Sequence, residues 1–200
     1  MMTLFVAFLL VVAAGGLEQG SPAETPTKSP RAEPDPCVLL TSAEIRAVQG
    51  ETVSATRRDD HNAGDLRLLQ CFYTTPTFAK SVSLTIAVAD PPRSSAPRRY
   101  WEEHFHGAEH KEARRSPARA ETEDDNEDAD RRPPVKVMGI GEEAFWTGTR
   151  VSGALYVLSK DRFLRISVGG ADDEQVKIGK SKQLLERVLL RLSGRRSRRP

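Results

Sequence analysis

The chain has few cysteines and no apolar run long enough to cross a membrane. Its two cysteines, Cys37 and Cys71, are not in a C-x-x-C arrangement, which excludes a thioredoxin-type redox motif. Two cysteines alone would also leave a zinc site short of ligands. The apolar run from Leu4 to Ala14 has 11 residues, whereas a spanning helix needs about 20. We therefore expect no transmembrane helix in the mature chain.

The sequence also lacks the common hydrolase signatures. Neither G-x-S-x-G nor H-E-x-x-H occurs, and no stretch brings together a base, a nucleophile and an orienting group. A hydrolase would need a polar constellation that only the folded chain assembles in a cleft. These absences favour a protein that is not an enzyme.

The N-terminal run has the length of a signal-peptide core. Val12 and Ala14 suit the small-residue positions before a cut, so residues 1–14 are predicted to be a signal peptide. No Lys or Arg precedes Leu4, so either the α-amino group supplies the usual charge or the true start lies upstream. No cysteine lies near the cut, so no lipid anchor is expected. The prediction is a secreted or periplasmic protein of the cell envelope; the alternative is an apolar N-terminal element of a cytosolic protein.

Two cysteines in an exported domain most often pair, so a Cys37–Cys71 disulfide is predicted. The closed loop would stabilise the fold by about 4 kcal/mol through chain entropy, before any strain is subtracted. Two buried thiols are the alternative.

Composition divides the chain further. Residues 15–35 are rich in Pro, Ser, Thr and charge and predict a flexible leader. A single domain is expected over residues 36–193, interrupted at residues 116–134 by a mobile acidic loop almost free of large apolar side chains. Residues 194–200 form a basic tail. The formal net charge is +2, so the local charge runs say more about partners than the overall balance.

The domain is predicted to be α+β, with an antiparallel sheet of two or more hairpins packed against N- and C-terminal helices. Thr41 and Glu44 form a capping box that begins a helix, and Gly50 ends it. Alternating apolar residues predict one hairpin from residues 68–75 and the strand that begins at Ser81, and a second from residues 154–159 and 162–168. A last helix is expected near residues 172–192, with an apolar stripe of Val176, Leu184, Leu185, Val188, Leu189 and Leu192.

Several short motifs together resemble a known family. They are "DPCVLLTSAEI", the later "CFY", "GIGEEAFW", the hairpin "LYVLSKDRFLRISV" and the terminal amphipathic helix. In this order they are similar to a family of exported actinobacterial proteins, mostly lipoproteins, that carry a domain of unknown function. The resemblance covers about residues 35–192 and implies a PsbP-like α/β sandwich and an extracytoplasmic address. It implies no catalytic residues, and the lipid-attachment cysteine of that family is absent here.

Histidines are clustered in "HFHGAEH". In a helix, Glu102, His106 and His110 would share one face; if Gly107 breaks the helix, His104 and His106 would converge instead. These four residues are the candidate ligands for a transition metal such as zinc, copper or nickel. A charged, solvated helix explains the same residues without a metal, so no cofactor is expected.

Three further motifs have simple explanations. "GIGEEA" matches a dinucleotide fingerprint, but the next residues, "AFWTGTR", are typical of a strand and a turn, where the fingerprint needs a helix. The run "ETEDDNEDAD" has no Gly for an EF-hand loop. The tail offers Arg195, Arg196, Arg198 and Arg199 as contacts for an anionic surface, without the interleaved aromatics of single-strand binding. The alternatives are a tail that only aids solubility and a tail that docks on the chain's own acidic loop. No specific nucleic-acid recognition is expected.

The expected function is therefore an exported, non-enzymatic binding or accessory module of the cell envelope, whose envelope partner or ligand the sequence does not identify. The alternative is an exported metal-binding protein that uses the segment from His104 to His110.

Overall fold

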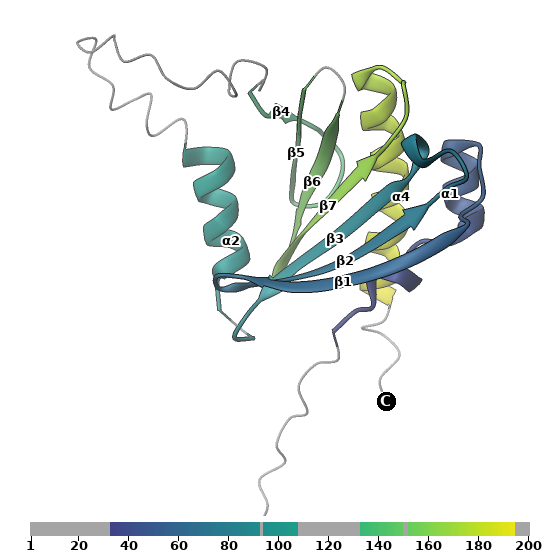
Figure 1. Cartoon of the computed structure of the whole chain (residues 1–200). Helices are drawn as coiled ribbons and strands as arrows, with labels where there is room; N and C mark the ends of the chain where they lie inside the picture. The colour runs from purple at the N-terminus through teal and green to yellow at the C-terminus, as the bar shows by residue number, and fades with distance from the viewer. Residues whose placement is uncertain (1–32, 93, 108–132, 150–151, 195–200) are drawn as a thin grey trace, which may run out of the picture. The chain divides into compact units, whose positions relative to one another are not determined.

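The computed structural model of the chain (Figure 1) describes residues 33–92, 94–107, 133–149 and 152–194. The described residues from Pro34 onward belong to one compact unit. The predicted signal peptide, most of the leader and of the acidic loop, His110 and the tail arginines lie outside the described residues.

A seven-stranded antiparallel sheet is the centre of the fold, with the strand order β1-β2-β3-β7-β6-β5-β4. The strands are β1 (Ala55–Ala63), β2 (Leu66–Thr74), β3 (Val82–Ala89), β4 (Val135–Lys136), β5 (Glu143–Gly148), β6 (Gly153–Ser159) and β7 (Arg162–Val168). Strands β3 and β7 pair in the middle of the sheet and join its N-terminal and C-terminal halves. The predicted α+β class with two antiparallel hairpins is confirmed.

The first face of the sheet packs against two helices, α1 (Ser42–Gln49) and α4 (Glu174–Gly194). Both lie on the same side of the sheet in Figure 1. The predicted capping box of α1 is present: the Glu44 amide donates to Thr41 Oγ1 at 3.2 Å, and the Thr41 amide donates to Glu44 Oε2 at 2.9 Å. Gly50 ends the helix with a φ of 77°, a conformation that glycine adopts without steric cost.

Helix α4 matches the predicted range closely, but one residue of its predicted apolar stripe was wrong. Val176 is exposed, whereas Lys177 and Ser181 face the core together with Leu184. The first half of the helix therefore presents a partly polar side to the sheet. In the second half of the helix the face predicted from hydrophobic periodicity is confirmed: Leu184, Leu185 and Val188 are all buried.

The second face is covered by α2 (Ala96–Trp101) and the π-helical turn η3 (Glu102–His106) that continues it. Helix α2 contacts β3 and β7, and Figure 1 shows it on the side of the sheet opposite α1 and α4. Trp101 and Phe105 are buried. The aromatic cluster under this helix consists of Tyr100, Trp101, Phe105, Phe145, Tyr156 and Phe163.

The predicted disulfide is present. Cys37, in the 3₁₀ turn η1 (Pro36–Val38), bonds to Cys71 of β2 with a Cα–Cα distance of 5.1 Å. Tyr73, two residues along the same strand, donates its hydroxyl to the carbonyl of Pro36. The covalent bond and this hydrogen bond together hold the entry to α1 against the sheet.

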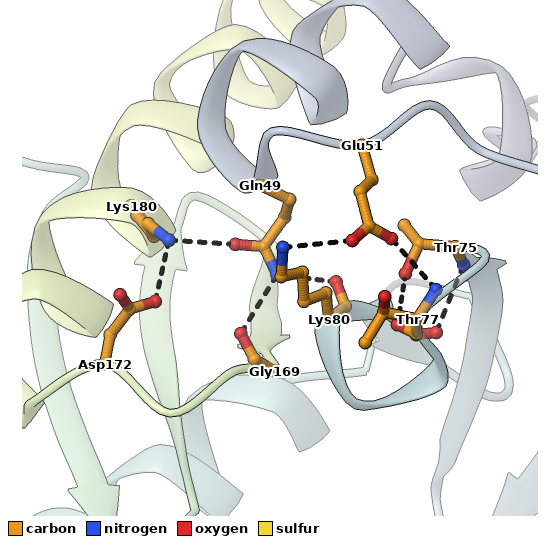
Figure 2. A network of polar contacts seen from close by, with 9 residues as sticks. Gln49, Glu51, Thr75, Thr77, Lys80, Gly169, Asp172 and Lys180 are labelled. Atoms are coloured by element: carbon orange, nitrogen blue, oxygen red, sulfur yellow. Dashed lines mark hydrogen bonds and ion pairs between the residues drawn. The ribbon is translucent and has the colours of Figure 1, made fainter.

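At the other end of α1, a polar network fastens the helix to the sheet and to α4 (Figure 2). The amide of Gln49 donates to the carbonyl oxygens of Lys80 and Gly169, and its own oxygen accepts from Lys180 at 3.3 Å. Lys180 also pairs with Asp172 at 2.7 Å. The 3₁₀ turn η2 (Phe78–Lys80) is thereby joined to the loop after β7. Because both polar atoms of the Gln49 amide have partners within the fold, the network stabilises the position of α1.

Candidate functional site

Next to the aromatic cluster under α2 and η3, the open end of the second face carries polar side chains on the central strands, and Tyr156 belongs to both groups. Strand register places Gln70, Thr85, Arg165 and Tyr156 directly opposite one another on β2, β3, β7 and β6. Because neighbouring strands lie about 4.8 Å apart, this cross-strand row extends over about 14 Å. We call these four residues the polar row. Its members come from interior strands, each of which is hydrogen-bonded to a neighbouring strand on both sides.

Arg165 is the charged member of the polar row. Its Nε donates to the hydroxyl oxygen of Tyr156 at 3.0 Å, and its guanidinium carbon lies 5.7 Å from the centre of the Tyr156 ring. A guanidinium in this position gains cation–π attraction as well as the hydrogen bond. In the described part of the chain, no carboxylate pairs with Arg165. The contacts therefore orient the guanidinium but supply no negative charge from the described residues to balance it.

The hydroxyl groups of Thr85 and Ser83, on the strand next to Arg165, have no hydrogen-bond partner among the described residues. Thr85 and Ser83 are only 8% and 9% exposed. Their unpaired hydroxyl oxygens are nevertheless not fully shielded from solvent. Their oxygens thus reach the surface although most of each residue is covered. Hydroxyl groups held in this way are available to a molecule that contacts the sheet.

An aromatic pair borders the polar side chains. Phe72 of β2 lies opposite Ser83, and its ring centre is 5.8 Å from that of Phe78 in η2. Phe78 is 70% exposed, which is unusual for a side chain of this size. The open end of the second face therefore combines one positive charge, several hydrogen-bonding groups and an exposed apolar edge.

A second polar cluster lies beneath η3 and centres on Glu143 of β5. Its Oε2 accepts from Trp101 Nε1 and lies 2.8 Å from His106 Nε2, and its Oε1 accepts from Lys136 Nζ at 3.1 Å. Partial burial opposes ionisation, but the hydrogen bonds from Trp101, His106 and Lys136 outweigh it and lower the pKa of Glu143 to about 2. The carboxylate is saturated with partners, so the cluster anchors η3 to the sheet.

The histidines predicted as metal ligands are held separately. The ring of His104 stacks on Tyr100 with centres 5.2 Å apart, and that of His106 faces Glu143. Glu102 is exposed on η3. The described ranges contain no group of three His, Cys, Asp or Glu side chains arranged to hold a metal ion. The metal site stays a prediction, since His110 is not among the described residues.

The glycine motif forms a turn before a strand. Gly139 and Gly141 have φ values of 77° and 63° and lead into β5, where a dinucleotide site would require a helix. A Cβ on Gly141 would lie 2.3 Å from Val157 Cγ1, so the close approach of the loop to β6 explains the glycine.

Sequence reasoning missed the polar row. The alternation of the second hairpin placed Phe163 and Arg165 on the face opposite Leu164, and the two-residue turn at Lys160–Asp161 sets Tyr156 opposite Arg165. The pairing of β3 with β7, which adds Thr85 and Gln70 to the row, was not predicted. Two open surface hollows, one beside Asp60 and Arg67 and one beside Arg98 and Lys160, lie elsewhere.

The comparisons with known proteins found no matching family model, no matching curated protein and no matching solved structure. The resemblance to exported actinobacterial proteins therefore stays a prediction. None of the helices among the described residues combines the length and apolar character needed to cross a membrane.

Chemically, the open end of the second face is suited to binding. Its polar row supplies one positive charge together with hydroxyl and amide groups that can form hydrogen bonds. This surface can hold and orient a ligand.

Proposed function

We propose that the chain is an exported, non-enzymatic binding or accessory module of the cell envelope that contacts its ligand with the open end of the second sheet face. The observation that carries this proposal is the orientation of Arg165 by Tyr156 without a carboxylate partner in the described part of the chain. A protein that needed Arg165 for stability alone would gain more by pairing its charge.

Export is supported by two independent features. Residues 4–14 have the length and composition of a signal-peptide core, and the Cys37–Cys71 bond is typical of an oxidising compartment. Fractionation of cells that express the full chain tests this part. We expect the protein outside the cytoplasm in a form shortened at its N-terminus; a full-length cytoplasmic product would contradict export.

The sheet itself supports a binding role. The first face is filled by the core under α1 and α4, so it contributes stability and leaves the second face to carry polar groups. Side chains on central strands are positioned more precisely than side chains on loops. A preorganised surface of this kind loses little entropy when a ligand binds.

A blocking substitution tests the proposed surface. Thr85→Phe would cover the polar row with a residue that strands favour. Thr56→Phe makes the same change at an exposed position of β1 on the first face and serves as the control. The full chain is incubated with a small-molecule extract of the cell envelope and analysed by native mass spectrometry.

We expect a molecule that wild-type protein and Thr56→Phe retain, that Thr85→Phe does not retain, and that is released with unchanged mass. Retention by all three proteins would show that the ligand contacts another surface. Release with an altered mass would show catalysis and overturn the non-enzymatic assignment. Retention by none would remove support for a small-molecule ligand at this face.

A further inference from the structure

We infer that Arg165 binds the carboxylate group of the ligand, and that this carboxylate is joined to an apolar group that lies towards Phe72 and Phe78. The inference rests on the proposed binding function of the second face and names the chemistry of its ligand.

Arg165 retains most of its hydrogen-bond donors. A guanidinium has five N–H donors, and Tyr156 occupies the one on Nε. The four N–H groups of the terminal nitrogens have no partner among the described residues. Two of them can point along parallel directions, which is the geometry that binds both oxygens of a carboxylate.

Neutral hydroxyl groups lie on both sides of this guanidinium. Tyr156 accepts from Arg165 through its oxygen, so its own O–H remains available to donate. Thr85 lies directly opposite Arg165 on β3, and side chains in such a pair have Cβ atoms about 5 Å apart. A carboxylate on the guanidinium is therefore within reach of neutral donors on both sides.

The charge of the polar row matches a single carboxylate. The row has one positive charge, and the nearest carboxylate along the same register is that of Asp59 on β1, opposite Gln70. By strand spacing, Asp59 is about 14 Å from Arg165. A carboxylate has a single negative charge and neutralises one guanidinium, whereas a dianionic phosphate would leave excess charge over a half-buried surface.

The aromatic pair indicates the rest of the ligand. Phe72 lies on β2, two strands away from Arg165, and is two residues beyond Gln70 of the polar row. By strand geometry the two positions are about 12 Å apart. The exposed ring of Phe78 extends this apolar edge. A carboxylate attached to an apolar chain or ring covers both features, and burying the Phe78 ring on binding is favourable.

The probe is 8-phenyloctanoate, whose extended chain can span the separation between Arg165 and Phe72; it is titrated into the full chain while backbone amides are followed by NMR. The matched alcohol, 8-phenyloctanol, has the same apolar group without the charge, and inorganic phosphate tests for a general anion site. The variants are Arg165→Gln, which removes the charge, and Arg165→Lys, which keeps the charge but loses the planar fork. Arg187→Gln changes an exposed arginine of α4 and is the control.

We expect saturable shifts at Gln70, Thr85 and Arg165 with 8-phenyloctanoate, at least tenfold weaker binding by Arg165→Gln, and an intermediate loss for Arg165→Lys. Arg187→Gln should bind like wild type. If Arg165→Gln fails to fold, Arg165→Lys and the comparison of acid with alcohol decide the question. Equal binding of the alcohol, tighter binding of phosphate at the same amides, or no binding would each overturn the carboxylate assignment. The proposed binding function is tested separately. If Thr85→Phe loses the envelope ligand while the carboxylate assignment fails, the binding function still stands.

Discussion

Arg191 of α4 and Glu44 of α1 form a two-fold hydrogen-bonded ion pair, with Nη1 to Oε2 and Nη2 to Oε1 both at 2.8 Å. The same carboxylate closes the capping box of α1 with Thr41, and Arg191 also donates to the carbonyl of Leu39. One acidic side chain thus caps its own helix and joins it to the last helix of the fold.

Replacing Glu44 by Gln should lower the free energy of unfolding at pH 7 by about 1–2 kcal/mol, because it removes a charge-assisted pair and weakens a cap. Glu186→Gln, at an exposed position of α4, should change it little. Urea unfolding of both variants checks this. Equal stabilities would show that the ion pair contributes nothing measurable.

The same group gives the protein a pH dependence. Partial burial opposes ionisation, but hydrogen bonds from Arg191 and Thr41 outweigh it and lower the pKa of Glu44 from 4.5 to about 2. Its contribution is fully present above about pH 4.5 and is lost as the pH falls towards 2. Urea unfolding at pH 7, 4.5 and 3 measures the free energy of unfolding. This free energy should fall less with decreasing pH for Glu44→Gln than for wild type.

Glu143→Ala should destabilise the fold by about 1–3 kcal/mol, because it leaves the donors of the buried Trp101 and the half-buried His106 without their acceptor. Glu103→Ala, on the exposed side of η3, is the control. Thermal unfolding followed by tryptophan fluorescence measures both. If the two variants melt together, Glu143 does not anchor η3.

Two glycine substitutions should have opposite signs. A Cβ on Gly153 would lie 2.2 Å from Trp146 Cζ2, whereas a Cβ on Gly179 would meet nothing within 4 Å. We expect Gly153→Ala to cost about 1–3 kcal/mol through overpacking and Gly179→Ala to stabilise α4 by about 0.5–1 kcal/mol. Denaturant midpoints give the comparison; a neutral Gly153→Ala would mean that the Trp146 ring moves aside freely.

Mass spectrometry of the non-reduced protein should show no free thiol, because Cys37 and Cys71 are bonded. The double variant Cys37→Ala/Cys71→Ala should lose up to about 4 kcal/mol through the entropy of the opened loop. Alkylation of both thiols in protein purified without reductant would contradict the bond and the compartment inferred from it.

The basic tail is predicted to bind anionic surfaces. Each arginine near such a surface contributes about 1 kcal/mol, and salt should weaken the binding. Sedimentation with anionic vesicles at low and high salt compares the full chain with a chain that ends at Gly194. Negligible binding by both would refute the prediction, and salt-independent binding by both would assign the contact to the folded unit.

The sequence predicted elements whose residues act locally. Thr41, Glu44 and Gly50 specify α1 through contacts within one helix, and alternation specifies β2, β3, β6 and β7. Strand β1 was not predicted, because it is an edge strand whose side chains are nearly all exposed on both faces, and its pairing with β2 alone makes it a strand. The polar row was missed for a related reason: its members meet through register between distant strands.

The central pairing of β3 with β7 joins a strand from the first half of the chain to one near its C-terminal end. A chain made from its N-terminus completes α1, the first three strands and both cysteines of the disulfide early. Strand β7 and helix α4 come last in the chain. The hydrogen-bonding edge of β3 that pairs with β7 therefore has no partner until almost the whole domain has been synthesised. A product truncated before Arg162 would expose a buried strand edge of the kind that drives aggregation.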